Sequence, residues 1–358
     1  MIVLCPFFIG EKMEISEKIS ELLKNAETED LFDKAVAGYL LPDGTSHIVT
    51  LNTPEDTVFD IASLTKVCPT STLALTYILE SKLSIDAKVI DFIPELKTNY
   101  RDDICVSHLL THSLDYRVPM KTLTALTAEG ILDALYTYQF EAAPGTVFNY
   151  GNPASVLLGI LLQRLTGKNL QEQGNERFFT PLGMTRSGYN PLTRVPKSEI
   201  AATELCEFRH REIQGEVHDE SAWVLQKLFP VGSAGMFSCV PDLLKFVKMI
   251  LMDGRFEDQQ IIPAGVLDIV SHNAFPDDFG ACAALGWELN APRFMGTKVS
   301  PQAFGKTGFT GASIVADPDK GGAIVLLSNF TYPHREPNAD RIHAFRALLS
   351  DAFFEELG

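Results

Sequence analysis

Strand patterns stand at both ends of this chain, and helical patterns fill its middle. Near the start, the apolar runs 35–41 and 47–51 flank an Asp-Gly pair, which predicts a β-hairpin. Near the end, the runs 312–316 and 323–327 flank a turn rich in Asp and Gly, which predicts a second hairpin. Hairpins so far apart in the sequence predict one antiparallel sheet that the two ends of the chain build together.

Segments between and beyond the hairpins have apolar residues at helical spacing. They are residues 14–24, 62–80, 131–138, 152–166, 241–251 and 339–354. For the helix that begins at Asn152, we expect Asn152 as the N-cap, Pro153 as the first helical residue and Gly167 as the stop. Pro69 removes a backbone donor near the start of its helix and predicts a kink there.

These patterns predict an α+β fold in a single domain that spans residues 1–358. An antiparallel sheet flanked by helices would form an α/β lobe from about residues 14–60 and 280–358. Residues from about 61 to 279 would form an inserted, all-helical lobe. A chain of 358 residues is long enough to bury the core that such an arrangement needs.

The net charge of −16 and the lack of any Lys/Arg run argue against nucleic acid as a partner. They also give no reason to expect an anionic membrane surface. Residues 1–10 are apolar but have no basic region before them and no cleavage site after them, so they make a poor export signal. We therefore expect a cytoplasmic protein, translated from Met1 or Met13. The sequence does not indicate the oligomeric state.

The Cys and His residues do not form a metal-binding pattern. No C-x-x-C pair occurs, and we expect the six cysteines to be buried, reduced thiols. His108 and His112 lack a third ligand, so packing or capping is expected of them. The segment 218–220 (His-Asp-Glu) has no H-E-x-x-H partner and is expected to be a hydrogen-bonding loop near a cleft. We therefore expect neither a metal nor a cofactor.

Three short motifs, each present once, follow one another along the chain. They are Ser63-Leu64-Thr65-Lys66, Tyr150-Gly151-Asn152 and Lys306-Thr307-Gly308. Together they supply a hydroxyl nucleophile, two lysines and a phenol, the groups of an acyl-serine hydrolase without a histidine base. No G-x-S-x-G elbow occurs in the chain, which argues against an ordinary α/β-hydrolase.

Residues three apart on a helix share a face, so Ser63 and Lys66 place a hydroxyl beside an amine. Serine is a weak nucleophile that needs a neighbouring base. Lys66 can be that base only if its pKa is lowered, and Tyr150, with an ordinary pKa of about 10, only if nearby ammonium groups favour the phenolate. Lys306 would supply such a charge. The residues alone leave the base open between Lys66 and Tyr150.

An anionic intermediate needs donors that face it. The start of the helix at Ser63 offers backbone N–H groups and a positive dipole end. A strand that carries Lys306, Thr307, Gly308 and Phe309 along the cleft would offer a second donor. Gly308 is expected to let a substrate approach this backbone closely.

Longer stretches around the motifs resemble the class C β-lactamase-related family of serine hydrolases. This family includes class C β-lactamases, D-alanyl-D-alanine carboxypeptidases, D-amino-acid peptidases and esterases. The resemblance extends from about residue 35 to 330. It rests on the segments 59–66, 106–112, 145–150, 181–184, 215–219, 234–238 and 305–311.

The resemblance implies a β-lactamase and penicillin-binding-protein-like fold, and a role for each motif residue. Ser63 would be acylated, Lys66 and Tyr150 would share proton transfer, and Asn152 would orient Lys66 or a substrate amide. Lys306 would hold positive charge near Tyr150 and a substrate carboxylate.

The resemblance further implies that the backbone N–H groups of Ser63 and Phe309 form the oxyanion hole, with Thr307 and Gly308 beside the substrate. The chain departs from the family pattern at residues 113–116, where Ser-Leu-Asp-Tyr replaces Thr-Ser-Gly. Phe309 is also bulky where β-lactamases carry a small residue, which narrows the space for a fused-ring substrate.

These observations predict a serine hydrolase that cleaves a small ester or amide through an acyl-Ser63 intermediate, as an esterase or a peptidase-like enzyme. One alternative is β-lactamase or D-alanyl-D-alanine carboxypeptidase activity. The other is a non-catalytic binding protein that retains the fold. The expected partner is a small-molecule ester, amide or peptide.

Overall fold

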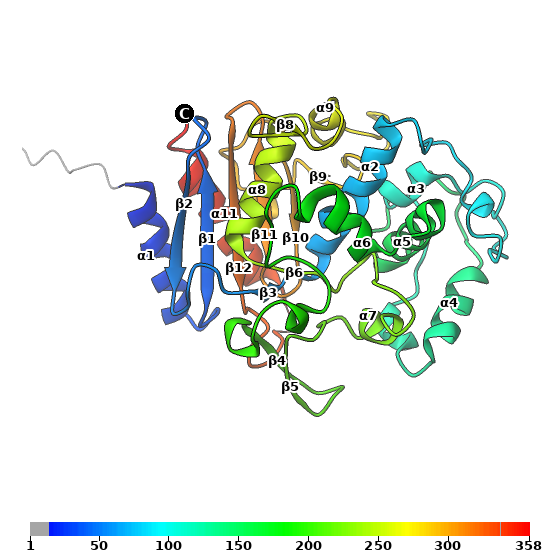
Figure 1. Cartoon of the computed structure of the whole chain (residues 1–358), viewed down its shortest axis with the longest axis horizontal. Coiled ribbons are helices and arrows are strands. Elements are labelled where there is room, and N and C mark those ends of the chain that lie inside the picture. Colours follow the sequence, from blue (N-terminus) through cyan, green and yellow to red (C-terminus); the bar gives the residue numbers. More distant parts are fainter. Residues whose placement is uncertain (1–13, 337) are drawn as a thin grey trace, which may run out of the picture.

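The structure is a computed structural model that describes residues 14–336 and 338–358 (Figure 1). The predictions on the start codon (Met1 or Met13), on the apolar segment 1–10 and on Cys5 lie outside the described residues. Within them, no helix combines the length and the apolar character needed to cross a membrane.

Both ends of the chain build the central sheet, as predicted. Within the described residues it has six antiparallel strands in the order β2-β1-β12-β11-β10-β9. They are β1 (Ala35–Leu40), β2 (Ser46–Leu51), β9 (Glu288–Leu289), β10 (Phe304–Thr307), β11 (Ser313–Asp317) and β12 (Gly322–Ser328). Both predicted hairpins are confirmed, and β1 pairs with β12, with Val36 opposite Leu327.

Helices cover both faces of the sheet. Helices α1 (Ile15–Thr28) and α11 (Asp340–Phe354) lie on one face, and α8 (Val240–Leu251) lies on the other (Figure 1). Alternate side chains of a strand point to opposite faces, and β1 follows this rule. Val36 and Leu40 join the core under α8, whereas Ala37 and Tyr39 join the core under α1 and α11. The sheet therefore separates two hydrophobic cores.

The remaining helices lie between the two hairpins in sequence. Most of them lie on one side of the sheet in space, whereas α10 packs against α11 (Figure 1). They are α2 (Thr72–Leu79), α3 (Val106–Leu110), α4 (Ala128–Tyr136), α5 (Asn152–Thr166), α6 (Leu170–Gly174), α7 (Glu220–Leu225), α9 (Val266–Ser271) and α10 (Pro292–Met295). The α+β prediction, with helices inserted between the two halves of a sheet, is confirmed.

The chain outside the central sheet also contains short strand pairs, which the helical pattern did not predict. They are β3 (Phe59–Asp60) with β6 (Phe237–Ser238), β4 (Ala202–Cys206) with β5 (Arg211–Gln214), and β7 (Arg255–Phe256) with β8 (Gln259–Gln260). Each strand is too short to give a clear alternation in sequence. The proposed division into lobes near residues 61 and 280 stays a prediction.

Helix α5 has the predicted span but not the predicted N-cap. Gly151, in an extended conformation, is the N-cap, and Asn152 and Pro153 are the first two helical residues. The Asn152 side chain bonds to Lys66 and Asp219 instead of capping the helix. Gly167 ends the helix in the left-handed region at φ 72°, as predicted.

The predicted helix 62–80 is interrupted. A 3₁₀ turn (Ala62–Lys66) and a π turn (Val67–Ser71) precede α2, and Cys68 is non-helical at φ −119° and ψ 99°. Pro69, which follows Cys68 through a cis peptide bond, has no N–H for the helical ladder. The predicted kink is therefore a break that separates the Ser63 turn from α2.

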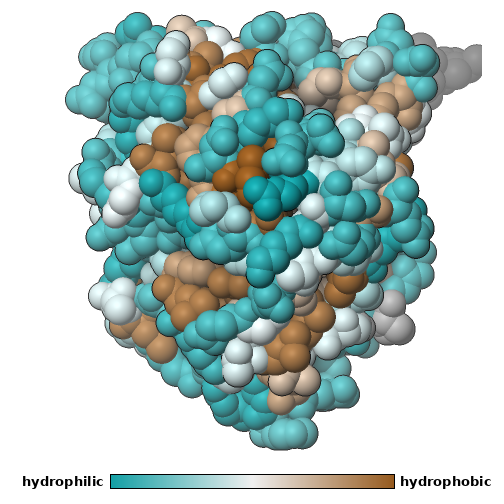
Figure 2. Space-filling model, turned by 90° about the vertical axis from the view of Figure 1, so that its right-hand side faces the viewer, coloured by the Kyte–Doolittle hydropathy of each residue, from teal (hydrophilic) through white to brown (hydrophobic). Residues whose placement is uncertain are grey.

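The cysteines match the prediction only in part. Cys68, Cys206 and Cys239 are buried free thiols, whereas Cys105 is partly exposed and Cys282 is exposed. The surface on the helical side of the molecule is largely hydrophilic, with separate apolar patches between charged side chains (Figure 2).

Gly38 lets helix α8 approach the sheet. A Cβ atom at Gly38 would overlap Val240 Cγ1 and lie 2.8 Å from Leu244 Cδ1. We predict that Gly38→Ala lowers the free energy of unfolding by about 1–3 kcal/mol, since overpacking forces side chains off their rotamers. Urea denaturation measures this loss. The double variant Gly38→Ala/Val240→Ala should lose less than the sum of the two single variants, and strict additivity would contradict the proposed contact.

Candidate active site

Ser63 lies in a tight turn between strand β3 and helix α2. The preceding residue, Ala62, has φ 45°, a conformation that non-glycine residues rarely adopt and that clusters at functional sites. The turn is held by two bonds: the Ala62 N–H donates to Asp60 Oδ1 (2.8 Å) and the Ile61 N–H donates to the carbonyl of Met236 (3.1 Å). The position of Ser63 is therefore set by backbone bonds on its N-terminal side.

Lys66 is buried, and its ammonium group has three acceptors. Nζ donates to Ser63 Oγ (2.9 Å), Asn152 Oδ1 (2.9 Å) and the carbonyl of Ser233 (3.1 Å). Burial lowers the pKa of Lys66, and the charge of Lys306 lowers it further, while Tyr150 opposes this change. Lys66 thus joins the nucleophile to the start of helix α5.

Asn152 is oriented by Asp219, a residue without an assigned role in the motifs. Asn152 Nδ2 donates to Asp219 Oδ2 (2.8 Å), which leaves Asn152 Oδ1 to face Lys66. The other oxygen of Asp219 accepts from Ser221 Oγ and from the Ala222 N–H, which caps helix α7. The expected hydrogen-bonding loop at residues 218–220 is confirmed.

Tyr150 lies between two lysine ammonium groups. Lys306 Nζ is 4.2 Å and Lys66 Nζ is 5.3 Å from the centre of its ring. The side chain as a whole is 42% exposed, but its hydroxyl end is desolvated among these groups. Burial raises the pKa of Tyr150. The charges of Lys306 and Lys66 and the hydrogen bond with Ser63 outweigh burial and lower the pKa to about 8.

Lys306 is paired with Glu288, which the sequence did not identify. Lys306 Nζ lies 2.5 Å from Glu288 Oε1, and Arg293 binds the other oxygen of Glu288. Burial lowers the pKa of Lys306, but Tyr150 and Glu288 outweigh it, so the pKa is raised. Only 2% of the Lys306 side chain is exposed. Lys306 is therefore a buried cation that faces Tyr150 and Glu288.

His108 in helix α3 and His112 just after it have the structural roles expected of them. His108 Nδ1 accepts from the Cys105 N–H (3.0 Å) at the start of α3. The buried His112 ring packs against Tyr150, with ring centres 4.8 Å apart. Burial first, and then Lys66 and Lys306, hold the pKa of His112 well below its ordinary value. His112 is therefore a neutral wall of the site.

The end of strand β10 is held against the nucleophile turn. A Cβ atom at Gly308 would lie 2.5 Å from the carbonyl oxygen of Ile61, so this glycine is required by the protein's own backbone. The expectation that Gly308 also lets a substrate approach the backbone stays a prediction. Thr310 Oγ1 also donates to the carbonyl of Asp60 (2.6 Å).

Arg346 of helix α11 ties the turn that follows β10. Its Nη2 donates to the carbonyls of Gly308 (2.7 Å) and Ala312 (3.0 Å), the two ends of that turn. Burial and the nearby Arg293 lower the pKa of Arg346 to about 9. A buried guanidinium therefore holds the loop that carries Phe309, another residue that the sequence did not identify.

A cleft of about 570 Å³ opens at Ser63. Tyr150, Thr307, Gly308 and Phe309 line it beside Ser63, and Phe330 and Ile342 give it an apolar part. Lys306 lies behind Tyr150 and lines a separate, very small hollow together with Glu288. The structure thus gathers all eight predicted site residues, five in one hydrogen-bonded and charged cluster and three along the cleft.

The fold agrees with the comparison with known families. The Beta-lactamase family model matches residues 42–349, most of the chain. The chain belongs to this family of serine hydrolases.

Two curated relatives are named as a carboxypeptidase and an amidase. A protein of Escherichia coli (strain K12) named "Putative D-alanyl-D-alanine carboxypeptidase" is 31% identical over 317 residues, which are 79% of this chain and 72% of that protein. A protein of Bacillus subtilis (strain 168) named N-acetylmuramyl-L-alanine amidase is 28% identical over 317 residues, covering 79% and 71%.

Solved structures share the fold at lower identity. EstCE1, described as a hydrolase with promiscuous acyltransferase activity, has a TM-score of 0.71 at 20% identity and covers 94% of this chain and 98% of its own. A class C β-lactamase has a TM-score of 0.72 at 19% identity, with the same coverage. The β-lactamase and penicillin-binding-protein-like fold predicted from the sequence is confirmed.

The contact between Asp219 and Asn152 can be tested against an ordinary helix cap. Asp219→Ala removes a cap and should cost about 1 kcal/mol of stability, as should Thr127→Ala, which removes the cap of α4. We predict that only Asp219→Ala also lowers ester hydrolysis, by about tenfold or more, because Asn152 loses its orientation. Urea denaturation and 4-nitrophenyl acetate turnover measure the two effects. Equal activity in both variants would contradict this role of Asp219.

Proposed function

We propose that this protein is a hydrolase that cleaves small esters or amides through an acyl-enzyme on Ser63. The observation that carries the proposal is the chain of contacts from Ser63 through Lys66 to Asn152, beside a tyrosine whose pKa is about 8. A nucleophile, an adjacent proton acceptor and a group that orients them are the parts that acyl transfer needs. A non-catalytic binding protein would not require this cluster.

Tyr150 is the better supported base. Each of the three N–H donors of the Lys66 ammonium group has its own acceptor, and these bonds favour the protonated form. A base needs a free lone pair, and a phenol with a pKa of about 8 supplies one at near-neutral pH. Lys66 and Lys306 then act by stabilising the phenolate.

The reaction follows from these roles. Ser63 Oγ attacks the substrate carbonyl carbon as its proton passes to the Tyr150 phenolate. The backbone N–H groups of Ser63 and Phe309 stabilise the tetrahedral oxyanion. Collapse of the intermediate expels the alcohol or amine, which takes the proton from Tyr150. Water then attacks the acyl ester as one of its protons passes to the Tyr150 phenolate. The bond between the acyl carbon and Ser63 Oγ breaks, the carboxylic acid leaves, and Tyr150 returns the proton to Ser63 Oγ.

At Lys306 a neutral ester fits better than a carboxylate-bearing substrate does. Lys306, the cation that the resemblance assigns to a substrate carboxylate, already has Glu288 as its counter-ion and lies behind Tyr150. Arg335, which also lines the cleft, is paired with Glu204 and Glu220. The names of the curated relatives favour carboxypeptidase or amidase activity as the second candidate. A cytoplasmic location stays part of the proposal.

Replacement of the nucleophile tests the proposal directly. Ser63→Ala should lower kcat/KM for 4-nitrophenyl acetate by about a thousandfold or more, because no hydroxyl remains to form the acyl-enzyme. The control is Ser46→Ala, at an exposed position of strand β2. Turnover that survives in Ser63→Ala would place the chemistry elsewhere.

The pH dependence tests the base. The phenolate is the active form, so kcat/KM should rise with pH through a midpoint near 8 and level off above it. Lys306 lowers the pKa of Tyr150, so Lys306→Met should move this midpoint to higher pH by roughly one unit or more. The exposed Lys97→Met variant should leave it in place.

Tyr150→Phe then separates the two candidate bases. If Tyr150 is the base, this variant loses the limb near pH 8 and about a hundredfold or more in rate. A limb that persists in Tyr150→Phe would assign the proton transfer to Lys66.

A further inference from the structure

Phe309 projects into the cleft beside Ser63, and two side chains hold it there. Its side chain is 51% exposed. The His218 ring stacks on it, with ring centres 5.3 Å apart and planes 30° apart. The Arg335 guanidinium lies 5.8 Å from the Phe309 ring centre, within the range of a cation–π contact.

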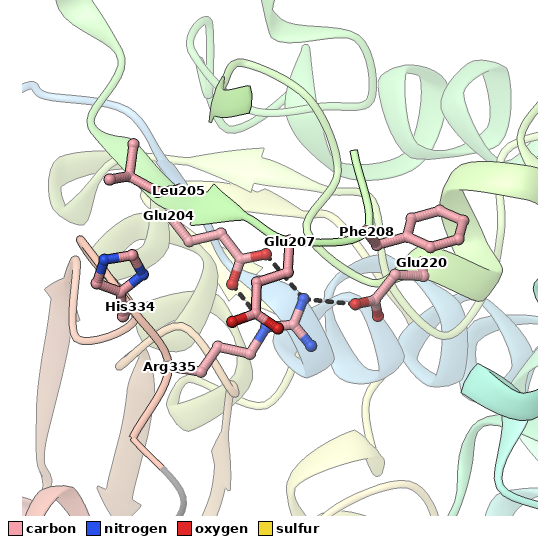
Figure 3. Close-up of a pocket in the computed structure, with 7 residues that line it drawn as sticks. All are labelled: Glu204, Leu205, Glu207, Phe208, Glu220, His334 and Arg335. Carbon is pink, nitrogen blue, oxygen red and sulfur yellow. Dashed lines mark hydrogen bonds and ion pairs between the residues drawn. The ribbon is translucent and has the colours of Figure 1, made fainter. Parts of the chain in front are cut away.

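The two residues that contact Phe309 are themselves joined by one carboxylate. His218 Nε2 lies 2.8 Å from Glu204 Oε2. Arg335 binds the same carboxylate with two parallel bonds, from Nε (2.6 Å) and Nη2 (2.8 Å), as Figure 3 shows. A closed network of contacts therefore joins four residues, and we call it the Phe309 network: Phe309, His218, Glu204 and Arg335.

The Phe309 network has further contacts with its surroundings. Arg335 Nη2 also donates to Glu220 Oε1 (2.6 Å), the second ion pair in Figure 3. The His218 N–H donates to Asp60 Oδ2 (2.6 Å), and the other oxygen of this carboxylate holds the turn before Ser63. The Phe309 network is thus connected to the nucleophile segment through Asp60.

An exposed phenylalanine ordinarily turns among several rotamers, and a substrate can displace it. Here the Glu204 side chain is only 3% exposed and its bond with Arg335 is bidentate, the strongest geometry for such a pair. Breaking that bond would leave a buried carboxylate short of a partner, so Glu204 holds His218 and Arg335 in place beside Phe309. The stacking on His218 and the cation–π contact with Arg335 therefore favour the rotamer in which Phe309 forms a wall of the cleft.

We propose that the Phe309 network determines substrate specificity, and that it restricts the enzyme to esters and amides of small, unfused acyl groups. This inference rests on the proposed hydrolase function and names its substrate class. Phe309 is the wall, and His218 and Glu204 are positioning residues that act through it. Arg335 positions Phe309 and also lines the cleft itself.

The test compares two esters with the same leaving group, 4-nitrophenyl acetate and 4-nitrophenyl 1-naphthoate. The measured quantity is the ratio of kcat/KM for naphthoate to kcat/KM for acetate. Phe309→Ala should raise this ratio by about tenfold or more, since it removes the wall. Glu204→Gln leaves the cleft lining unchanged but weakens the Phe309 network. It should also raise the ratio, by a smaller factor than Phe309→Ala does.

The matched control is Glu95→Gln, which weakens a bidentate pair with Arg164 outside the cleft. Its ratio should stay at the wild-type value. His218→Asn removes the ring stacked on Phe309 and replaces Glu204→Gln should that variant fail to fold, because His218, unlike Arg335, does not line the cleft. It should also raise the ratio.

The outcomes separate the two levels of the argument. Wild-type turnover of acetate that Ser63→Ala does not abolish would overturn the proposed function. Acetate turnover that depends on Ser63, with an unchanged ratio in Phe309→Ala, would overturn the inference alone. A raised ratio in Phe309→Ala, with wild-type ratios in both Glu204→Gln and His218→Asn, would show that the wall does not need the network and would also overturn the inference.

Discussion

Two lysine ammonium groups buried around one phenol are the interaction on which this site depends. Burial alone would drive Lys66 and Lys306 toward the neutral form, and each would repel the other. The structure meets this cost with acceptors: a hydroxyl, an amide and a carbonyl for Lys66, and Glu288 for Lys306. What remains uncompensated favours the Tyr150 phenolate. The same charges that are costly to bury thus create a base.

The topology is what brings these groups together. Lys306 comes from a strand of the central sheet, and Tyr150 directly precedes a helix of the inserted part. The pairing of β1 with β12 joins both ends of the chain in that sheet, and β10 contacts the turn that carries Ser63 and Lys66. The contact of Gly308 with the backbone of Ile61 then sets the spacing between the sheet and the nucleophile turn. The charged cluster spans the junction between the sheet and the helices, so it forms only when these two parts pack together.

The sequence predicted what is local or repeated in a motif. Turn residues located both hairpins, and the order of three motifs located the nucleophile and its neighbours. The sequence could not predict partners that meet only in three dimensions: nothing near Glu288 or Arg346 in the chain indicates that one pairs with Lys306 or that the other ties the end of β10. The wrong N-cap has the same origin, because Asn152 fits a local capping pattern while its amide serves a long-range contact. At Pro69 the kink was predictable, but the extent of the break was not.

The pairing of Lys306 with Glu288 also bears on how one architecture serves different substrates. A lysine behind the base can stabilise a phenolate, or it can attract a substrate carboxylate, but a single charge is weakened for one task when it is used for the other. Here Glu288 occupies one face of the ammonium group and Tyr150 another, and only 2% of the side chain is exposed. A carboxylate-bearing substrate would have to compete with Glu288 at a desolvated position, a cost that a neutral ester avoids. The shared catalytic cluster therefore leaves specificity to its surroundings: the counter-ion behind the base, and the wall at the cleft.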